Sequence, residues 1–138
     1  MEKLEHIGIA VKNIDESNAL FAKLLGRAHY KIEEVPSEGV RTSFFDVSGV
    51  KIELLEATKA DSPIARFLEK KGEGIHHLAF EVADIRESVK EYREKGFEPI
   101  GNAIKKGADN KMICFLHPKT SGGVLIELCQ EITEPSSD

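Results

Sequence analysis

The chain has 138 residues, of which 41% are hydrophobic and 31% charged, an ordinary composition for one folded domain or two closely packed halves. Its formal net charge is −5 and it contains no long basic run, which argues against nucleic acid and anionic membranes as partners. No apolar stretch approaches the roughly 18 residues of a membrane span. The first residues, MEKLEHIGIAV, have the pattern of a strand rather than of a signal peptide. We therefore expect a small cytoplasmic domain.

The first half of the chain has the pattern of a strand, a helix and three further strands. Residues 4–11 alternate and are bounded by turn residues, which is typical of a strand. Asn13 and Glu16 form a capping box, and apolar residues then recur at helical spacing up to Gly26, at the C-cap position. Strand-like runs follow at 28–35, 39–47 and 50–55.

A linking helix is predicted at residues 61–71, with Pro63 in its first turn, and the second half then repeats the order of the first. Asp84 and Glu87 form a second capping box, and Gly96 lies where that helix ends. Strand-like runs follow at about 97–100, 111–117 and 123–130.

The two halves are similar in sequence as well as in pattern. HIGIAVKNIDES, which starts at His6, matches HLAFEVADIRES, which starts at His77, at an offset of 71 residues. VKIELLE overlays VLIELCQ and pairs Glu53 with Glu127. A duplicated β-α-β-β-β module explains both matches. The predicted organisation is one domain, 1–131, made of module one (about 1–58), the linking helix (about 61–71) and module two (about 74–131), followed by a flexible tail, 132–138.

Strand alternation directs one histidine and one glutamate of each module to the same face. Successive side chains of a strand point to opposite faces, and the bulky face must pack against the helices. His6 and His77 therefore point to the helix-free face, beside small residues that leave space. The same alternation places Glu53 and Glu127 on that face.

Two imidazoles and two carboxylates that converge in a protein interior predict a metal site. Burying such ions costs several kcal/mol each unless they are compensated, and a divalent cation removes that cost. Each residue taken alone is better explained as a satisfied polar group, but the duplication places the same pair twice. We therefore expect His6, Glu53, His77 and Glu127 to be the ligands of an octahedral Co²⁺, Mn²⁺, Ni²⁺ or Zn²⁺.

The remaining polar residues give weaker signals. We expect His76 to be a packed core residue on the helix side, His29 to be solvated, and His117 to be a candidate for the substrate entrance. Cys114 and Cys129 lack metal-ligand spacing and are interpreted as buried free thiols in a reducing cytoplasm. The loop KKGADNK could close over a bound molecule. Four lysines could meet an anionic ligand, with a solvated loop as the alternative for most of them: Lys105, Lys106, Lys111 and Lys119.

Several segments resemble the vicinal oxygen chelate superfamily, which includes glyoxalase I, fosfomycin-resistance proteins, extradiol dioxygenases and methylmalonyl-CoA epimerases. The resemblance is greatest to the epimerase family, extends to about residue 131, and is carried by LEHIGIAV, KIELLEAT, DSPIARFLEKKGEGIHHLAF, ICFLHPK and GGVLIELCQ. It implies an α+β fold in which two tandem βαβββ modules form a curved, incomplete eight-stranded barrel. It also implies a homodimer, a CoA thioester substrate and one divalent metal ion per subunit, with Co²⁺ ahead of Mn²⁺, Ni²⁺ and Zn²⁺.

The resemblance further implies epimerisation at C2 of methylmalonyl-CoA, through proton removal to an enolate that the metal stabilises as a Lewis acid. Such a reaction needs an acid/base on each face of the planar intermediate. Some family members have a glutamate at the position of Thr42, and threonine cannot be a base. We therefore expect Glu127 to act on one face and Glu53 on the other, with Thr42 and Lys119 as candidates for substrate contact.

Other members of the superfamily remain as alternatives. A lactoylglutathione lyase of the glyoxalase I type would have a similar four-ligand site. Extradiol dioxygenases and fosfomycin-modifying transferases use three ligands, so that Glu53 is surplus. A non-enzymatic, ligand-binding member would lack a complete ligand set. The native metal, the preferred acyl group and the residues that hold the CoA nucleotide stay open.

Overall fold

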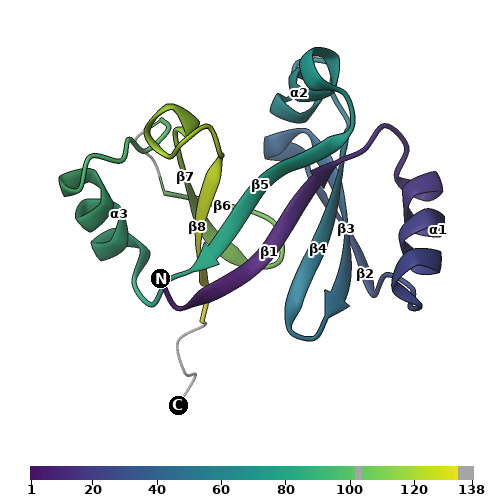
Figure 1. The fold of residues 1–138 in the computed structure, drawn as a ribbon, viewed down its shortest axis with the longest axis horizontal. Helices are drawn as coiled ribbons and strands as arrows, with labels where there is room; N and C mark the ends of the chain where they lie inside the picture. Colours follow the sequence, from purple (N-terminus) through teal and green to yellow (C-terminus); the bar gives the residue numbers. More distant parts are fainter. Residues whose placement is uncertain (102–103, 134–138) are drawn as a thin grey trace.

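The computed structural model describes residues 1–101 and 104–133, so most of the predicted tail lies outside the described residues. The chain forms one curled sheet with α-helices packed against it (Figure 1). The strands are β1 (Lys3–Ala10), β2 (Lys31–Val35), β3 (Val40–Val47), β4 (Val50–Ala57), β5 (Gly74–Glu81), β6 (Lys105–Lys106), β7 (Lys111–Leu116) and β8 (Ile126–Glu131). The helices are α1 (Ile14–Leu25), α2 (Pro63–Lys71) and α3 (Ile85–Glu94), with 3₁₀ helices η1 (Pro36–Glu38) and η2 (Pro118–Thr120). Among the described residues, no helix is long and apolar enough to cross a membrane.

The sheet shows the duplication directly. Its strand order is β2-β3-β4-β1-β5-β8-β7-β6. Counted from the centre outward, β1-β4-β3-β2 of module one correspond to β5-β8-β7-β6 of module two. β1 pairs in parallel with β4, β5 pairs in parallel with β8, and the antiparallel pair β1–β5 joins the modules at the centre. The predicted pair of β-α-β-β-β modules in a curved eight-stranded sheet is thereby confirmed.

One predicted strand is wrong and two begin later than expected. Residues 97–100 form only an isolated bridge, between Pro99 and Leu116, and the outermost strand of module two is the short β6 instead. β2 begins at Lys31, and β8 begins at Ile126, after a turn at the 3₁₀ helix η2. The other predicted elements lie within two residues of their observed bounds.

Helix caps fix where α1 and α3 begin. The side-chain oxygen of Asn13 accepts a hydrogen bond from the Glu16 amide at 3.0 Å. Asp84 accepts from two amides, of Arg86 at 3.1 Å and of Glu87 at 3.3 Å. These bonds satisfy amides that have no partner within the helix, as the capping pattern predicts.

Apolar clusters on both faces of the sheet position the strands. α1 covers the outer face of module one, and α3 covers that of module two (Figure 1). The inner face is predicted to be free of helices, but it is not. Ile64 of α2 packs at one end of it against Ala10 and Leu55. Both cysteines are buried and free, as predicted. Cys114 lies in the outer cluster under α3 and Cys129 in an inner cluster, so they occupy opposite faces of the sheet.

Removing the caps tests this account of the helix starts. We expect Asn13→Ala to lower the free energy of unfolding by about 1 kcal/mol and Asp84→Ala by about 1–2 kcal/mol, since Asp84 serves two amides. Denaturant unfolding measures both. Asn13→Asp and Asp84→Asn are matched controls that keep an acceptor and should stay near the wild-type value. Equal losses in the controls would contradict the capping explanation.

Candidate active site

The four central strands each contribute one of the four predicted ligand side chains to the concave face. His6 comes from β1, Glu53 from β4, His77 from β5 and Glu127 from β8. Small residues separate them in the ladder. Gly8 lies opposite His77 and Glu53, and Ala79 lies opposite His6 and Glu127. The arrangement repeats the internal twofold relation of the modules.

The four side chains converge on one point. The two imidazoles face each other with their Nε2 atoms 3.1 Å apart. Glu53 Oε1 lies 3.3 Å from Nε2 of His6 and 3.6 Å from Nε2 of His77. Glu127 lies 3.5 Å from Nε2 of His6 through Oε2 and 3.4 Å from Nε2 of His77 through Oε1. All four residues are at most 6% exposed.

These separations suit donors around one divalent cation. Nitrogen and oxygen ligands lie about 2.0–2.2 Å from such an ion, which places neighbouring ligands roughly 3.0–3.5 Å apart. His6, His77 and Glu127 could hold a metal, because their donor atoms lie within 4.8 Å of one another. Glu53 adjoins the same two ring nitrogens from the side of module one.

The other nitrogen of each imidazole has a partner of its own. His6 Nδ1 lies 2.7 Å from Glu5 Oε1, and His77 Nδ1 lies 2.9 Å from His76 Nδ1. Glu5 and His76 each directly precede the histidine that they contact. Neither has a paired residue in the β1–β5 ladder, whose register shifts at these two positions. Because a bulge reverses the facing of one residue, both side chains turn toward the concave face. Sequence alternation therefore missed Glu5. It also placed His76 on the face opposite to the cavity that it lines, although the ring is packed as predicted, against Phe67 of α2.

The pKa values show how the groups act on one another without a cation. Burial by itself lowers the pKa of His6, but the carboxylates of Glu53, Glu127 and Glu5 together outweigh burial and raise it to about 9. Burial raises the pKa of Glu127 to about 8, and it also raises the pKa of Glu53. The pKa of His77 falls well below its ordinary value, through burial and the neighbouring His6. A divalent cation would stabilise both carboxylates in their charged form.

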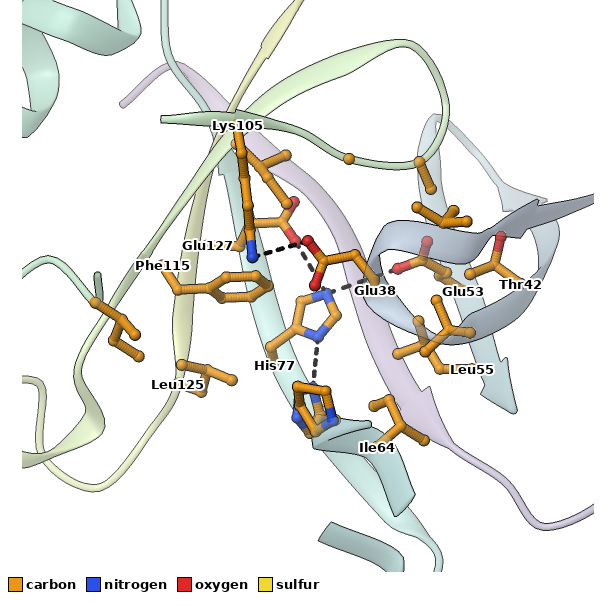
Figure 2. A pocket seen from close by; sticks show the side chains of 18 residues that line it. Glu38, Thr42, Glu53, Leu55, Ile64, His77, Lys105, Phe115, Leu125 and Glu127 are labelled. Carbon is orange, nitrogen blue, oxygen red and sulfur yellow. Dashed lines mark hydrogen bonds and ion pairs between the residues drawn. The ribbon is translucent and has the colours of Figure 1, made fainter. Parts of the chain in front are cut away.

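A cavity of about 220 Å³ lies over this cluster and is lined by Glu53, His77 and Glu127 (Figure 2). An ion pair joins the two modules beside it, with Lys105 Nζ of β6 lying 2.7 Å from Glu38 Oε1 of η1. The walls are largely apolar and include Val40, Leu55, Ile64, Ile113, Phe115 and Leu125. The cavity thus offers a small apolar space with the polar groups concentrated on one side.

The structure brings some of the predicted substrate-contact residues to the cavity and not others. Thr42 lines it, with its hydroxyl donating to the Glu33 carbonyl at 3.3 Å. Lys119 is exposed in η2 and does not line the cavity, so the structure does not support the predicted contact. His117 caps η2 by accepting from the Lys119 amide and is also absent from the lining.

The remaining lysines and His29 also have defined positions. Lys105 lines the cavity and Lys106 is exposed outside it. Lys111 is buried, 3.9 Å from Asp109, rather than solvated. His29 packs its ring edge-on against Phe45 instead of being fully solvated. The loop between β6 and β7 contributes Gly107 and Ala108 to the lining of the cavity, and its closing over a bound molecule stays a prediction.

Comparison with known proteins identifies the class to which this fold and site belong. The family model described as the Glyoxalase/Bleomycin resistance protein/Dioxygenase superfamily matches residues 5–115. The chain therefore belongs to this superfamily.

Several relatives that the chain resembles are named as epimerases. The chain is 38% identical to the mitochondrial methylmalonyl-CoA epimerase of Homo sapiens over 129 residues, 93% of this chain and 73% of that protein. It is 38% identical to the ethylmalonyl-CoA/methylmalonyl-CoA epimerase of Cereibacter sphaeroides over 130 residues, 93% of this chain and 97% of that protein. A variant of Streptomyces coelicolor methylmalonyl-CoA epimerase in complex with 2-nitronate-propionyl-CoA superposes with a TM-score of 0.90 at 32% identity, covering 99% of both chains.

Gly8 tests how tightly the site is packed. A Cβ at this position would lie 2.2 Å from Cε1 of His77, so an alanine must displace the ring. We expect Gly8→Ala to weaken Co²⁺ binding at least about tenfold, because it would move a predicted ligand, His77. Spectroscopic titration with Co²⁺ measures this, with the symmetry-related Ala79→Gly as control. Binding that is unchanged in Gly8→Ala would contradict the ligand role of His77.

His76 predicts a pH dependence of stability. Burial lowers its pKa to about 4, so between pH 4 and 6.5 the unfolded chain binds more protons at this site than the folded chain. The contribution of neutral His76 is therefore present above pH 6.5 and declines as the pH falls toward 4. We expect His76 to account for about 2 kcal/mol of the stability lost between pH 7 and pH 5. Denaturant unfolding of the metal-free wild-type and His76→Asn proteins measures the difference, and equal losses would contradict it.

Proposed function

We propose that this protein catalyses metal-dependent epimerisation at C2 of methylmalonyl-CoA and interconverts its (R) and (S) thioesters. The observation that carries the proposal is the pair of buried carboxylates, Glu53 and Glu127, beside two imidazoles at a cavity of about 220 Å³. A cavity of this size admits a short branched acyl group, and the nucleotide of CoA would remain outside. The similarity to methylmalonyl-CoA epimerases over 93% of the chain supports the same substrate.

The chemistry requires a weak carbon acid to lose its proton. The C2 proton lies between a thioester and a carboxylate, and its removal places negative charge on the thioester oxygen. A divalent cation bound by His6, His77, Glu53 and Glu127 would supply electrostatic stabilisation of that charge. The apolar walls of the cavity exclude water from the reacting carbon and strengthen these interactions.

Glu127 and Glu53 are the proposed acid/base groups on the two faces of the enolate. They belong to different modules and approach the imidazole pair from β8 and β4. Both line the cavity, where a bound acyl group is within reach of either carboxylate. Burial raises the pKa of Glu127 to about 8 without a cation, and a bound cation would lower it again toward the charged form that accepts the C2 proton.

The proposed cofactor is one divalent metal ion per subunit, with Co²⁺ ahead of Mn²⁺, Ni²⁺ and Zn²⁺. Two nitrogen and two oxygen donors, with open positions left for water or substrate, suit each of these ions. His77, Glu53 and Glu127 line the cavity, so an ion held by the cluster would be open to a substrate carbonyl bound there. Lys105 lines the cavity and pairs with Glu38, and in this proposal it also meets an anionic group of the CoA thioester.

The proposed assembly is a homodimer, and the proposed compartment is the cytoplasm. α1 and α3 lie at opposite ends of the molecule, with β1 and β5 between them (Figure 1). Four apolar side chains of these central strands are only half-buried: Leu4, Ile7, Leu78 and Phe80. A second copy of the chain would cover them. A reducing compartment suits the two buried free thiols.

Proton NMR of methylmalonyl-CoA in D₂O tests the proposal. We expect the metal-free protein to leave the C2 proton signal unchanged, and the protein loaded with Co²⁺ to remove it while one epimer converts to the other. Absence of exchange with both forms would contradict the epimerase function. The hemithioacetal of methylglyoxal and glutathione is then the substrate to test, as for a glyoxalase I-type lyase.

Variants of the two carboxylates separate their roles in the same assay. We expect Glu53→Gln and Glu127→Gln each to slow epimerisation by at least about 100-fold, because each removes the acid/base of one face. Each variant should still exchange the C2 proton of one epimer, and the two should prefer opposite epimers. Glu69→Gln, on the exposed side of α2, is the control for the same substitution. Full epimerisation by metal-loaded Glu53→Gln would refute its assignment.

A further inference from the structure

Glu5 is a buried carboxylate to which the proposed reaction assigns no role. It is 3% exposed, and the bulge in β1 turns it toward the concave face beside His6. Its two oxygens have different partners, because Oε1 lies 2.7 Å from His6 Nδ1 and Oε2 lies 3.0 Å from Lys51 Nζ. Glu5 therefore links a site imidazole to a lysine on the neighbouring strand β4.

The chain of ion pairs continues from Lys51 into the second module. Lys51 Nζ also lies 2.7 Å from Asp109 Oδ2, in the turn between β6 and β7. Asp109 Oδ1 accepts from Lys31 at 2.6 Å, and the Asp109 amide donates to Glu33 at 2.9 Å. Negative and positive groups alternate along the chain, so Lys51 and Asp109 each lie between two groups of opposite charge.

The shape of the β6–β7 turn brings Asp109 to this position. Asp109 and Asn110 both have left-handed backbones, with φ of 58° and 54°, a conformation that these residue types tolerate better than most. Ala108 packs into the apolar cluster of module one that contains Leu55. Gly107 has no room for a side chain, because a Cβ would lie 2.7 Å from Ile113. The turn is thus seated across the module boundary.

We propose that Glu5 is the positioning residue of His6, and that Lys51 and Asp109 hold its carboxylate in place. His6 Nδ1–H donates to Glu5, which leaves the lone pair of Nε2 directed at the centre of the site, 3.1 Å from His77 Nε2. The turn of module two thereby sets the orientation of a side chain of module one. The proposal rests on the metal-binding role given to His6 above.

Zn²⁺ affinity and NMR of the Zn²⁺-loaded protein test this role. We expect Glu5→Gln to weaken Zn²⁺ binding about 10- to 100-fold in competition with a chromophoric chelator. The Nδ1–H proton of His6 should shift and exchange faster with water, because its partner is no longer charged. Lys51→Met should cause a smaller change of both measurements in the same direction.

Lys31→Met is the matched control. It removes another cation from Asp109 but does not contact Glu5, so Zn²⁺ affinity should stay within about twofold of wild type. Thermal unfolding shows which variants fold. If Glu5→Gln does not fold, the Zn²⁺ affinity and the Nδ1–H signal of Lys51→Met test the proposal instead. Folded Glu5→Gln with wild-type affinity and an unmoved Nδ1–H signal would overturn the proposal, as would a wild-type protein that binds no Zn²⁺. A wild-type protein that binds Zn²⁺ and shows the Glu5 effect, but does not epimerise methylmalonyl-CoA, supports the role of Glu5 and overturns only the proposed function.

Discussion

Four ionisable side chains share one desolvated space on the concave face of the sheet, and their charges balance only when a proton or a cation is added. If both carboxylates were ionised beside one protonated imidazole, the cluster would carry a net negative charge in a region where each group is at most 6% exposed. The raised pKa of Glu127, to about 8, expresses that imbalance in the metal-free protein. A bound cation would resolve it and would also supply the Lewis acid that removal of a C2 proton requires. A bound cation would thus both stabilise the buried carboxylates and serve the proposed reaction.

The duplicated fold builds this site by bringing equivalent residues of the two modules together. The antiparallel pair β1–β5 joins the modules at the centre of the sheet and sets His6 against His77, while the flanking parallel strands supply the glutamates. Bulges at Glu5 and His76 recur at equivalent positions, and each adds a partner for the nearby imidazole. Duplication therefore reproduced the backbone irregularities as well as the strands.

Regular strand geometry is what made much of the site predictable from the sequence. His6, His77 and the two glutamates lie where alternation holds, so their common face follows from the period of two. Glu5 and His76 could not be placed in this way, because one unpaired residue reverses the facing and leaves no distinct mark in the composition. Asp109 could not be found either. Its contact with Lys51 spans 58 residues and depends on how the sheet curls.

The two histidines and two glutamates at the centre of the site are related by the internal twofold of the modules, but the residues around them are not. In the aligned segments Lys51 corresponds to Leu125, which lines the cavity, and Glu5 corresponds to His76, which carries no charge at neutral pH because burial lowers its pKa to about 4. The side of Glu53 thus has a network of buried and half-buried ion pairs behind it, whereas the equivalent positions on the side of Glu127 carry no charge. In the proposed reaction the two faces of a planar enolate would meet acid/base groups of different strength. An enzyme built from two copies of one module can therefore remove and return a proton at different rates on its two sides, while the equilibrium between the epimers is left to the substrate.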